Sequence, residues 1–389
     1  MPVTRVAPRP RPLARAALAG LCAGLLALIA WPRAALAYPQ FQLTTGADRC
    51  EACHVSPGGG GLLNAFGRDE AGSTVSQRGD GRLLHGLWQP PSWLELGGDL
   101  RGALGVKDHE DRTRVLGFPM QADLYTRVVV GAWSANVIAG LRGVAREPRP
   151  ELLYRLASRE HYLMYQPEAG SGLSVRLGRF FPVFGLRSQD HTAYVRRYLG
   201  QHTLEEPYTV ALAHQGERSE LHASLFAPQP VPILGAGPRA WGGALSYERR
   251  AREDTAAWAV QSRVAVTSED VRAAAGVLGK LWVPTSQLLL LAELDVQRQS
   301  FDVGAARWQL AGYLGATRMM LPGWMVTGAL QLWDPDLALR SSSRGAAELN
   351  LQVFPLAHLE LHLLGRLEAV GNDFDHPSLL GLLQLHYYL

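Results

Sequence analysis

Apolar and polar side chains alternate one by one along many short segments of this chain. In residues 357–368, AHLELHLLGRLE, every odd position is apolar or glycine and most even positions are charged or histidine. The same period of two recurs in residues 94–106, 121–132 and 288–297. Because successive side chains of a strand point to opposite faces, each segment predicts a strand with one apolar and one polar face.

The number and length of these segments favour a membrane barrel over a soluble sandwich. About sixteen segments of roughly ten residues lie between Trp93 and Leu389, and a tilted strand of that length crosses a bilayer. The long connectors are predicted near residues 107–120, 147–158, 182–206, 228–238, 298–306, 333–343 and 370–377. The short ones are predicted near 135, 168–170, 215–217, 283–285, 320–323 and 355, with a short link near 268–270 as the exception on the other side. Long loops on one side and tight turns on the other are typical of outer-membrane barrels.

Residues 93–389 are therefore predicted to form an all-β, transmembrane antiparallel barrel of about sixteen strands in outer-membrane lipid. The polar faces are expected to line the lumen with Glu95, Asp99, Arg101, Asp123, Arg127, Arg176, Glu293, Asp295, Glu348, His358, Glu360, His362 and Arg366. Tryptophans expected near strand ends, where aromatic girdles occur, are Trp133, Trp258, Trp282, Trp324 and Trp333. The connector 182–206 is interpreted either as a constriction folded into the lumen or as a solvated surface loop.

The first 37 residues predict a secretory signal peptide. Four arginines precede an apolar run from Ala16 to Trp31, and Ala35-Leu36-Ala37 provides the small residues of a cleavage site. The run is shorter than the ~20 residues of a spanning helix. Removal of this segment, with its five basic residues and Cys22, takes the formal charge from +3 to −2. No basic surplus remains that favours a nucleic-acid partner.

Cys50 and Cys53 are then the cysteines of an exported chain, and His54 follows directly. A disulfide across two residues constrains little of the chain, and a zinc site needs a second pair of ligands at matching spacing. Cys50-Glu51-Ala52-Cys53-His54 is the attachment motif of c-type haem, in which two thiols form thioethers and the imidazole binds the iron. Residues 38–92 are therefore predicted to hold one covalent haem c. A solvent-exposed dithiol or disulfide is the alternative.

The second axial ligand of the iron is harder to assign. No methionine occurs from Tyr38 until Met120, and His85 is the nearest nitrogen donor downstream of the motif. His85 is therefore the predicted second ligand, with an ordinary linker histidine as the alternative interpretation. His109, His191 and His202 are further candidates if the haem faces a cavity lined by the rest of the chain.

Residues 48–68 resemble a family of single-haem segments at the N-terminus of bacterial outer-membrane proteins. There the CxxCH motif is followed by a proline, a glycine run and an Asn-x-Phe-Gly-Arg stretch, which here are Pro57, Gly58 to Gly61 and Asn64 to Arg68. Residues 178–197, GRFFPVFGLRSQDHTAYVRR, are similar to a second segment of the same barrels. The resemblance implies a cytochrome-like segment joined to an outer-membrane β-barrel.

Three functions follow from this organisation, in order of preference. The first is an outer-membrane c-type cytochrome whose haem, at the periplasmic mouth or in the lumen, exchanges electrons with a periplasmic cytochrome or another redox partner. One haem does not bridge an apolar band about 25 Å tall, so each side needs a partner. The second is a porin for small polar solutes with the haem segment as a plug. The third is a haem peroxidase or sensor with an open iron site. The sequence has no evident acid–base pair near Cys50 to support it, so an electron carrier or pore is preferred to an enzyme.

Overall fold

The structure is a computed structural model that describes residues 47, 49–109, 112–142, 155–168, 172–202, 205–229, 239–251, 255–339, 341–371 and 373–389. The predicted signal peptide, Cys22 and the first mature residues lie outside these ranges. Among the described residues, no helix is long and apolar enough to cross a membrane.

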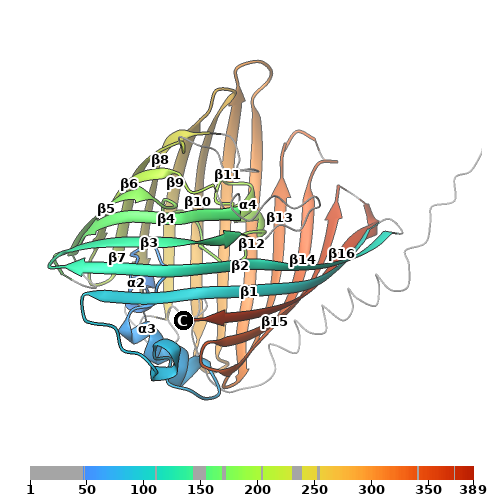
Figure 1. The fold of residues 1–389 in the computed structure, drawn as a ribbon. Helices are drawn as coiled ribbons and strands as arrows, with labels where there is room; N and C mark the ends of the chain where they lie inside the picture. The colour runs from blue at the N-terminus through green and yellow to red at the C-terminus, as the bar shows by residue number, and fades with distance from the viewer. Residues whose placement is uncertain are drawn as a thin grey trace, which may run out of the picture.

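Sixteen antiparallel strands form one closed barrel (Figure 1), which confirms the predicted fold and strand number. The strands are Leu94–His109 (β1), Arg112–Val130 (β2), Trp133–Arg142 (β3), Leu156–Tyr165 (β4), Gly172–Arg179 (β5), Tyr208–Gln215 (β6), Ser219–Ala227 (β7), Trp241–Arg250 (β8), Ala256–Val266 (β9), Asp270–Val283 (β10), Leu288–Phe301 (β11), Arg307–Leu321 (β12), Trp324–Asp334 (β13), Arg344–Leu356 (β14), Leu359–Val370 (β15) and Asp373–Tyr388 (β16). Each strand pairs with its sequence neighbours, and β1 pairs with β16 to close the sheet. Closure leaves no strand edge, so the ladder hydrogen bonds are made within the barrel.

Two of the predicted long connectors, near residues 107–120 and 370–377, are wrong. Residues 110–111 alone join β1 to β2, and residues 371–372 join β15 to β16. Neighbouring antiparallel strands can keep pairing until a tight turn ends them, and here pairing continues through the stretches expected to be loops. A bulge between Arg101 and Gly102 accommodates Pro119, which has no N–H to donate to the ladder.

The remaining connectors sort by end as predicted. The predicted long connectors from β3 to β4, β5 to β6, β7 to β8, β11 to β12 and β13 to β14 are at one end, which we call the long-loop end. The six predicted short links, which join β2 to β3, β4 to β5, β6 to β7, β10 to β11, β12 to β13 and β14 to β15, are at the other end, which we call the short-turn end. The link from β8 to β9 at this end was not predicted. The link between β9 and β10, residues 267–269, is at the long-loop end but is short, as predicted.

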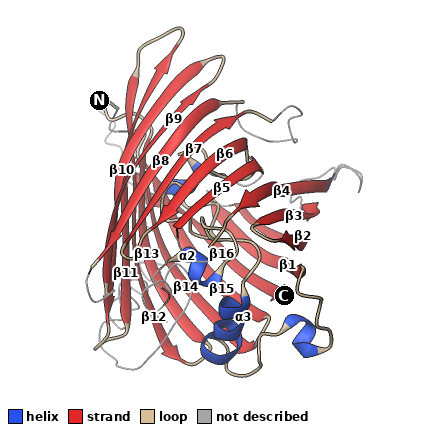
Figure 2. Cartoon of the chain, turned by 90° about the vertical axis from the view of Figure 1, so that its left-hand side faces the viewer, coloured by secondary structure: helices blue, strands red, loops and turns tan. Residues whose placement is uncertain are grey.

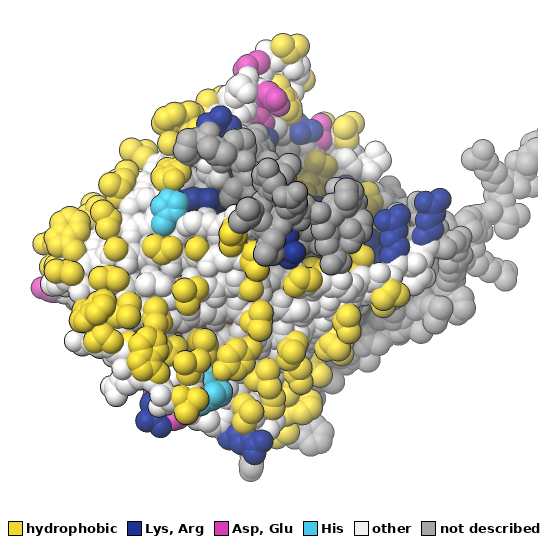
Figure 3. Space-filling view, in the orientation of Figure 1, with side chains coloured by type: hydrophobic (Ala, Val, Ile, Leu, Met, Phe, Trp, Pro, Cys, Tyr) yellow, Lys and Arg dark blue, Asp and Glu magenta, His cyan; other side chains and the backbone are white. Residues whose placement is uncertain are grey.

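The two faces of the strands differ in polarity as predicted. Outward side chains include Leu163 and Leu314, each 53% exposed, and apolar side chains gather over the strands in Figure 3. Inward, the predicted lumen residues that are buried are Asp123, Arg176, Glu293, Asp295, Glu348, His358, Glu360 and Arg366. An apolar exterior around a polar interior is the distribution found in outer-membrane barrels.

Tryptophans lie near both ends of the strands, with two corrections to the prediction. Trp133, Trp258 and Trp324 are exposed toward the short-turn end, and Trp241 and Trp308 are exposed toward the long-loop end. Trp282, predicted for the girdle, is partly buried on the inward face of β10, where it packs against the buried cluster that includes Leu186 and Leu278. Trp333, predicted for the girdle, instead faces the lumen, where its ring stacks on Tyr198 at a centroid distance of 4.6 Å. Its position in the alternation of β13 sets this direction, because Gln331 and Ala329 share its face.

Residues 47–93, called here the N-terminal segment, enter the barrel from the short-turn end. The segment contains α2 (Cys50–Cys53), α3 (Ala65–Glu70), the π-helix η1 (Ala71–Val75) and the 3-10 helix η2 (Leu83–Gly86). Figure 2 shows α2 within the ring of strands and α3 at its mouth. Backbone hydrogen bonds fix the segment to the β14–β15 turn, from Gln77 N to Phe354 O at 2.9 Å and from Ala357 N to Arg78 O at 2.8 Å.

The described residues 180–202 and 205–207, called here the inner loop, fold into the lumen from the long-loop end. They include the short helix α4 (Tyr194–Arg197). The Leu186 N–H donates to Glu293 of β11 at 2.9 Å, and the Tyr194 N–H donates to Gln331 of β13 at 2.7 Å. These partners stand on strands distant in sequence, so the loop crosses the lumen. The interpretation as a constriction is confirmed, and the surface-loop alternative is wrong.

The exposed apolar face predicts a specific sensitivity to charge. The variant Leu314→Arg, in the middle of β12, is expected to lower the free energy of unfolding by about 2–4 kcal/mol in lipid vesicles, because arginine is disfavoured on the lipid face at mid-depth. Urea titration of the folded barrel measures the loss. Val303→Arg is the matched control, because Val303 is 93% exposed in the connector 302–306. Equal stability of the two variants would contradict a lipid-facing position for Leu314.

Candidate functional site

One helical turn brings the two cysteines together. The helix α2 spans Cys50 to Cys53, and residues three apart lie on the same side of a helix. His54 follows in an extended conformation, and its backbone N–H donates to Cys50 O at 2.9 Å. Both cysteines are free thiols. The structure therefore places two thiols and an imidazole within one short stretch of chain.

The glycine run after the motif packs its backbone against the first thiol. Gly59, Gly60 and Gly61 have φ of 77°, 74° and 62°, a region that glycine adopts without steric cost. A Cβ atom at Gly59 would lie 3.0 Å from Cys50 Cβ and 3.3 Å from its Sγ, whereas a Cβ atom at Gly60 meets nothing within 4 Å. Gly59 therefore allows close approach to Cys50, and Gly60 serves only the turn.

Asn64 and Gly67 lock the next helix onto the motif. The Asn64 side chain caps α3 by accepting from Gly67 N at 2.9 Å, and its Nδ2 donates to Glu51 O and Ala52 O, each at 2.9 Å. A Cβ atom at Gly67 would lie 2.2 Å from Cys53 O. These contacts give a physical reason for the Asn-x-Phe-Gly pattern, which sequence reasoning noticed without assigning a role to either residue.

A cavity of about 390 Å³ lies between the N-terminal segment, the inner loop and the lumen wall. The N-terminal segment contributes Cys50, Cys53 and His54 to its lining. The inner loop contributes Leu186 to Gln189, His191 and Arg196, and the strand wall includes Arg101 and His386. This volume is within the roughly 300–1,000 Å³ of pockets that hold small molecules and cofactors.

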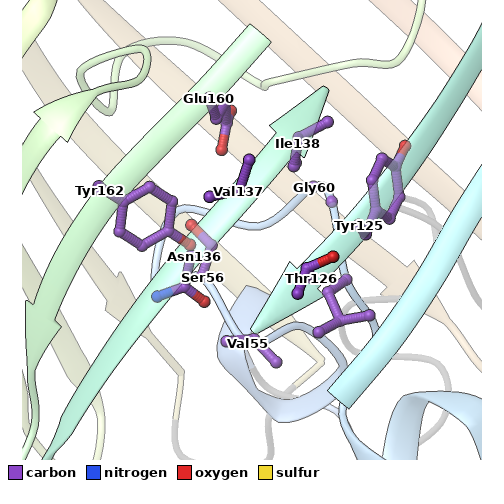
Figure 4. A pocket seen from close by; sticks show the side chains of 12 residues that line it. Val55, Ser56, Gly60, Tyr125, Thr126, Asn136, Val137, Ile138, Glu160 and Tyr162 are labelled. Atoms are coloured by element: carbon purple, nitrogen blue, oxygen red, sulfur yellow. The ribbon is translucent and has the colours of Figure 1, made fainter. Parts of the chain in front are cut away.

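Strands β2 to β4 support the N-terminal segment next to this cavity. Val55, Ser56 and Gly60 face Tyr125, Asn136, Ile138 and Tyr162 around a small pocket of about 10 Å³ (Figure 4). The buried Arg176 of β5 donates from Nη1 to Ser56 Oγ at 2.8 Å. Its guanidinium also lies 4.3 Å from the centre of the Phe180 ring. The lumen wall therefore supplies both apolar and charged contacts to the segment.

The inner loop contacts the glycine run that directly follows the motif. Arg187 Nη1 donates to Gly58 O at 2.6 Å. Burial and the positive charge of Arg187 lower the pKa of His54 to about 4. The His54 imidazole is therefore neutral at neutral pH, which is the form that binds a metal. Burial also raises the pKa of the Cys50 thiol.

The structure does not bring the predicted ligand His85 to His54. His85 lies in η2, where its ring is 4.7 Å from the His358 ring and its Nε2 is 3.3 Å from the Tyr387 hydroxyl. It is absent from the lining of the 390 Å³ cavity. The physical reason is that residues 76–86 run along the short-turn rim, held there by the β14–β15 turn, instead of folding back over the motif.

The other candidate histidines separate clearly. His109 ends β1 at the long-loop end. His191 lines the cavity, and His202 packs edge-on against it with ring centroids 5.4 Å apart. His386 of β16, which was not among the predicted candidates, also lines the cavity. Neither the alternation of a strand nor a local motif shows that a residue far along the chain lines this cavity. Which strand residues line it depends on how the barrel closes.

The donor set suits the haem c that the motif predicts. Two free thiols lie one helical turn apart, a neutral imidazole follows, and a backbone without a Cβ atom lies against Cys50. Arg187 and Arg196 line the same cavity and carry the positive charge that carboxylate groups need. Cys50, Cys53 and His54 are thus the residues able to hold such a group.

Solved outer-membrane proteins have the same fold as this chain. OprB of Pseudomonas putida matches with a TM-score of 0.58 and 9% identity over 76% of this chain and 94% of its own. OmpT of Vibrio cholerae matches with a TM-score of 0.57 and 8% identity over 77% and 99%. The outer-membrane channel DcaP of Acinetobacter baumannii matches with a TM-score of 0.54 and 14% identity over 76% and 97%. No protein-family model and no curated protein matches the chain.

The environment of Cys53 predicts slow alkylation. Burial and the nearby Glu70 carboxylate raise its pKa to about 12. At pH 8 such a thiol is roughly a thousandfold less ionised than an ordinary one, and the thiolate is the reactive form. In haem-free Cys50→Ala protein, iodoacetamide is therefore expected to modify Cys53 far more slowly in the folded state than in urea, with a rate that rises with pH beyond 9. Equal rates in the two states would show a solvent-exposed thiol.

Proposed function

We propose that this chain is an outer-membrane barrel that carries one covalent haem c inside its lumen and uses it for electron transfer. The observation that carries this proposal is that Cys50, Cys53 and His54 line one cavity, enclosed by the N-terminal segment, the inner loop and the lumen wall. The porin-like fold and the apolar exterior support a location in outer-membrane lipid.

The chain's own residues have separate roles in this proposal. Haem c, when bound, supplies an iron centre that gains and loses one electron. The Cys50 and Cys53 thiols would hold the group on α2 as thioethers. The neutral His54 imidazole would bind the iron. Arg187 donates to Gly58 O and thereby fixes the inner loop to the glycine run that follows the motif.

The position of the site limits how electrons enter and leave. Short turns of outer-membrane barrels lie on the periplasmic side, so the N-terminal segment enters from the periplasm. A periplasmic cytochrome or another periplasmic redox partner therefore has access to this mouth. An apolar band about 25 Å tall separates it from the outside, so a second partner or a diffusing carrier is needed there.

A porin for small polar solutes is the second candidate, and the comparisons favour it. The neighbours in fold include OprB and DcaP, and the latter is an outer-membrane channel. In this candidate the N-terminal segment is a plug, and solutes pass when it and the inner loop leave a path. The two candidates differ in whether covalent haem is present and whether the segment blocks conduction.

Covalent haem is the first expected result. Protein matured in cells that have the haem c attachment machinery should keep one haem per chain after denaturation, and Cys50→Ala/Cys53→Ala should lose it. Gly59→Ala should lower the haem-to-protein ratio because its methyl group crowds Cys50. Gly60→Ala is the matched control, because both variants carry the same left-handed strain of about 1–2 kcal/mol and only Gly59 touches the thiol. Absence of covalent haem from the wild-type protein would contradict the proposed function and leave the porin as the remaining candidate.

Conductance separates the two functions. Wild-type protein in planar bilayers is expected to conduct weakly, because the N-terminal segment and the inner loop both occupy the lumen. Removal of residues 47–86 should increase single-channel conductance, since the remaining wide barrel interior is aqueous in porins. Heat-dependent gel mobility checks that the shortened barrel folds. A large wild-type conductance that is the same with and without haem would favour the porin.

A further inference from the structure

We propose that His191 of the inner loop is the second axial ligand of the haem iron, so that the haem is held between the N-terminal segment and the barrel. This inference rests on the proposed function and names the residue that completes its iron site. It replaces His85, which faces the short-turn rim, with a residue that faces the motif cavity.

The lining of the cavity restricts the choice of ligand. Among the described residues, the histidines that line it are His54, His191 and His386, and no methionine lines it. Imidazole nitrogen and thioether sulfur are the common partners of a histidine on haem iron in electron carriers. With His54 assigned by the motif, His191 and His386 remain.

Both ring nitrogens of His386 are already engaged. Its Nδ1 contacts Glu360 Oε2 at 2.8 Å, and its Nε2 contacts Asp99 Oδ1 at 2.5 Å. The ring is buried between these two carboxylates. Iron binding would require one of these contacts to break and leave a carboxylate without its partner, which is unfavourable in a buried site.

His191 has the opposite arrangement, with a fixed backbone and an uncommitted ring. Asp190 accepts from Thr192 N at 2.8 Å and from Arg366 Nη2 at 2.5 Å. Thr192 Oγ1 accepts from Arg366 Nη1 at 2.7 Å. Within the described part of the chain, the ring of His191 contacts His202 edge-on and makes no hydrogen bond. Both neighbours of His191 are thus tied to β15, while its nitrogens are available.

The two walls that would carry the ligands are joined directly. Arg187, four residues before His191, donates to Gly58 O, four residues after His54. A Cβ atom at Gly58 would lie 3.0 Å from Val183 Cγ2, so the inner loop and the glycine run are in close contact. A haem bound by His54 and His191 would therefore crosslink two elements that already pack together. Two histidine ligands leave no open iron position and favour electron transfer over ligand binding.

Optical spectra of purified holoprotein test this assignment. Wild-type protein should be low-spin in both oxidation states and indifferent to carbon monoxide. His191→Ala should keep covalent haem at the wild-type ratio, become high-spin and bind carbon monoxide, and added imidazole should restore the low-spin spectrum. His202→Ala and His85→Ala are the matched controls and should remain low-spin.

A second variant keeps the test decisive if His191→Ala folds poorly. His191→Met should stay six-coordinate and have a higher reduction potential, because methionine ligation raises the potential. Low-spin, carbon-monoxide-insensitive haem in His191→Ala would overturn the assignment, and so would a high-spin wild type. In both cases covalent haem would remain and the proposed function would stand. Wild-type protein without haem would instead overturn the proposed function itself.

Discussion

The pairing of β1 with β16 is the constraint on which the other features depend. It runs from Asp99 opposite Tyr388 to Asp108 opposite Leu379, and it turns a sheet with two edges into a barrel with none. In apolar surroundings an open edge would leave backbone groups without partners, so closure is required. Closing sixteen strands also creates an interior too wide for wall side chains to fill. The chain fills it with the N-terminal segment from one end and the inner loop from the other.

The polar lumen wall holds these two elements in place. Glu293 and Gln331 accept backbone N–H groups of the inner loop, and Arg366 binds Asp190 and Thr192. Polar groups removed from water need such partners, and here the partners belong to the enclosed elements. Side chains that the sequence predicts to line a channel thus bind the inner loop and hold it in the lumen. For this reason the likeness to solved outer-membrane proteins describes the barrel, while the function has to be argued from what the barrel encloses.

Sequence reasoning succeeded where a feature is local or periodic. Alternation along residues such as 357–368 predicts strands, and their number predicts a closed barrel. It failed where the outcome depends on pairing between distant segments. Residues 107–120 were expected to loop out but extend a hairpin, Trp333 turned toward Tyr198, and His85 was carried to the rim by contacts of its neighbours with residues near 357. None of these partners can be identified before the barrel is closed.

The N-terminal segment is too short to have an apolar core of its own, and the barrel provides one. Val55 and Leu62 are buried together with Tyr125, Tyr162, Met164, Phe180 and Ala211 of the barrel and the inner loop, and Val75 is buried against Met325 and Phe354. Domains of this size generally need a metal, a crosslink or a partner surface to be stable. Here the partner surface is the lumen wall, which explains how a motif typical of an independent haem domain occurs without the rest of such a domain. A cofactor held by Cys50, Cys53 and His54 would then have its surroundings set by β-strands and the inner loop, so its reduction potential would be a property of the whole chain.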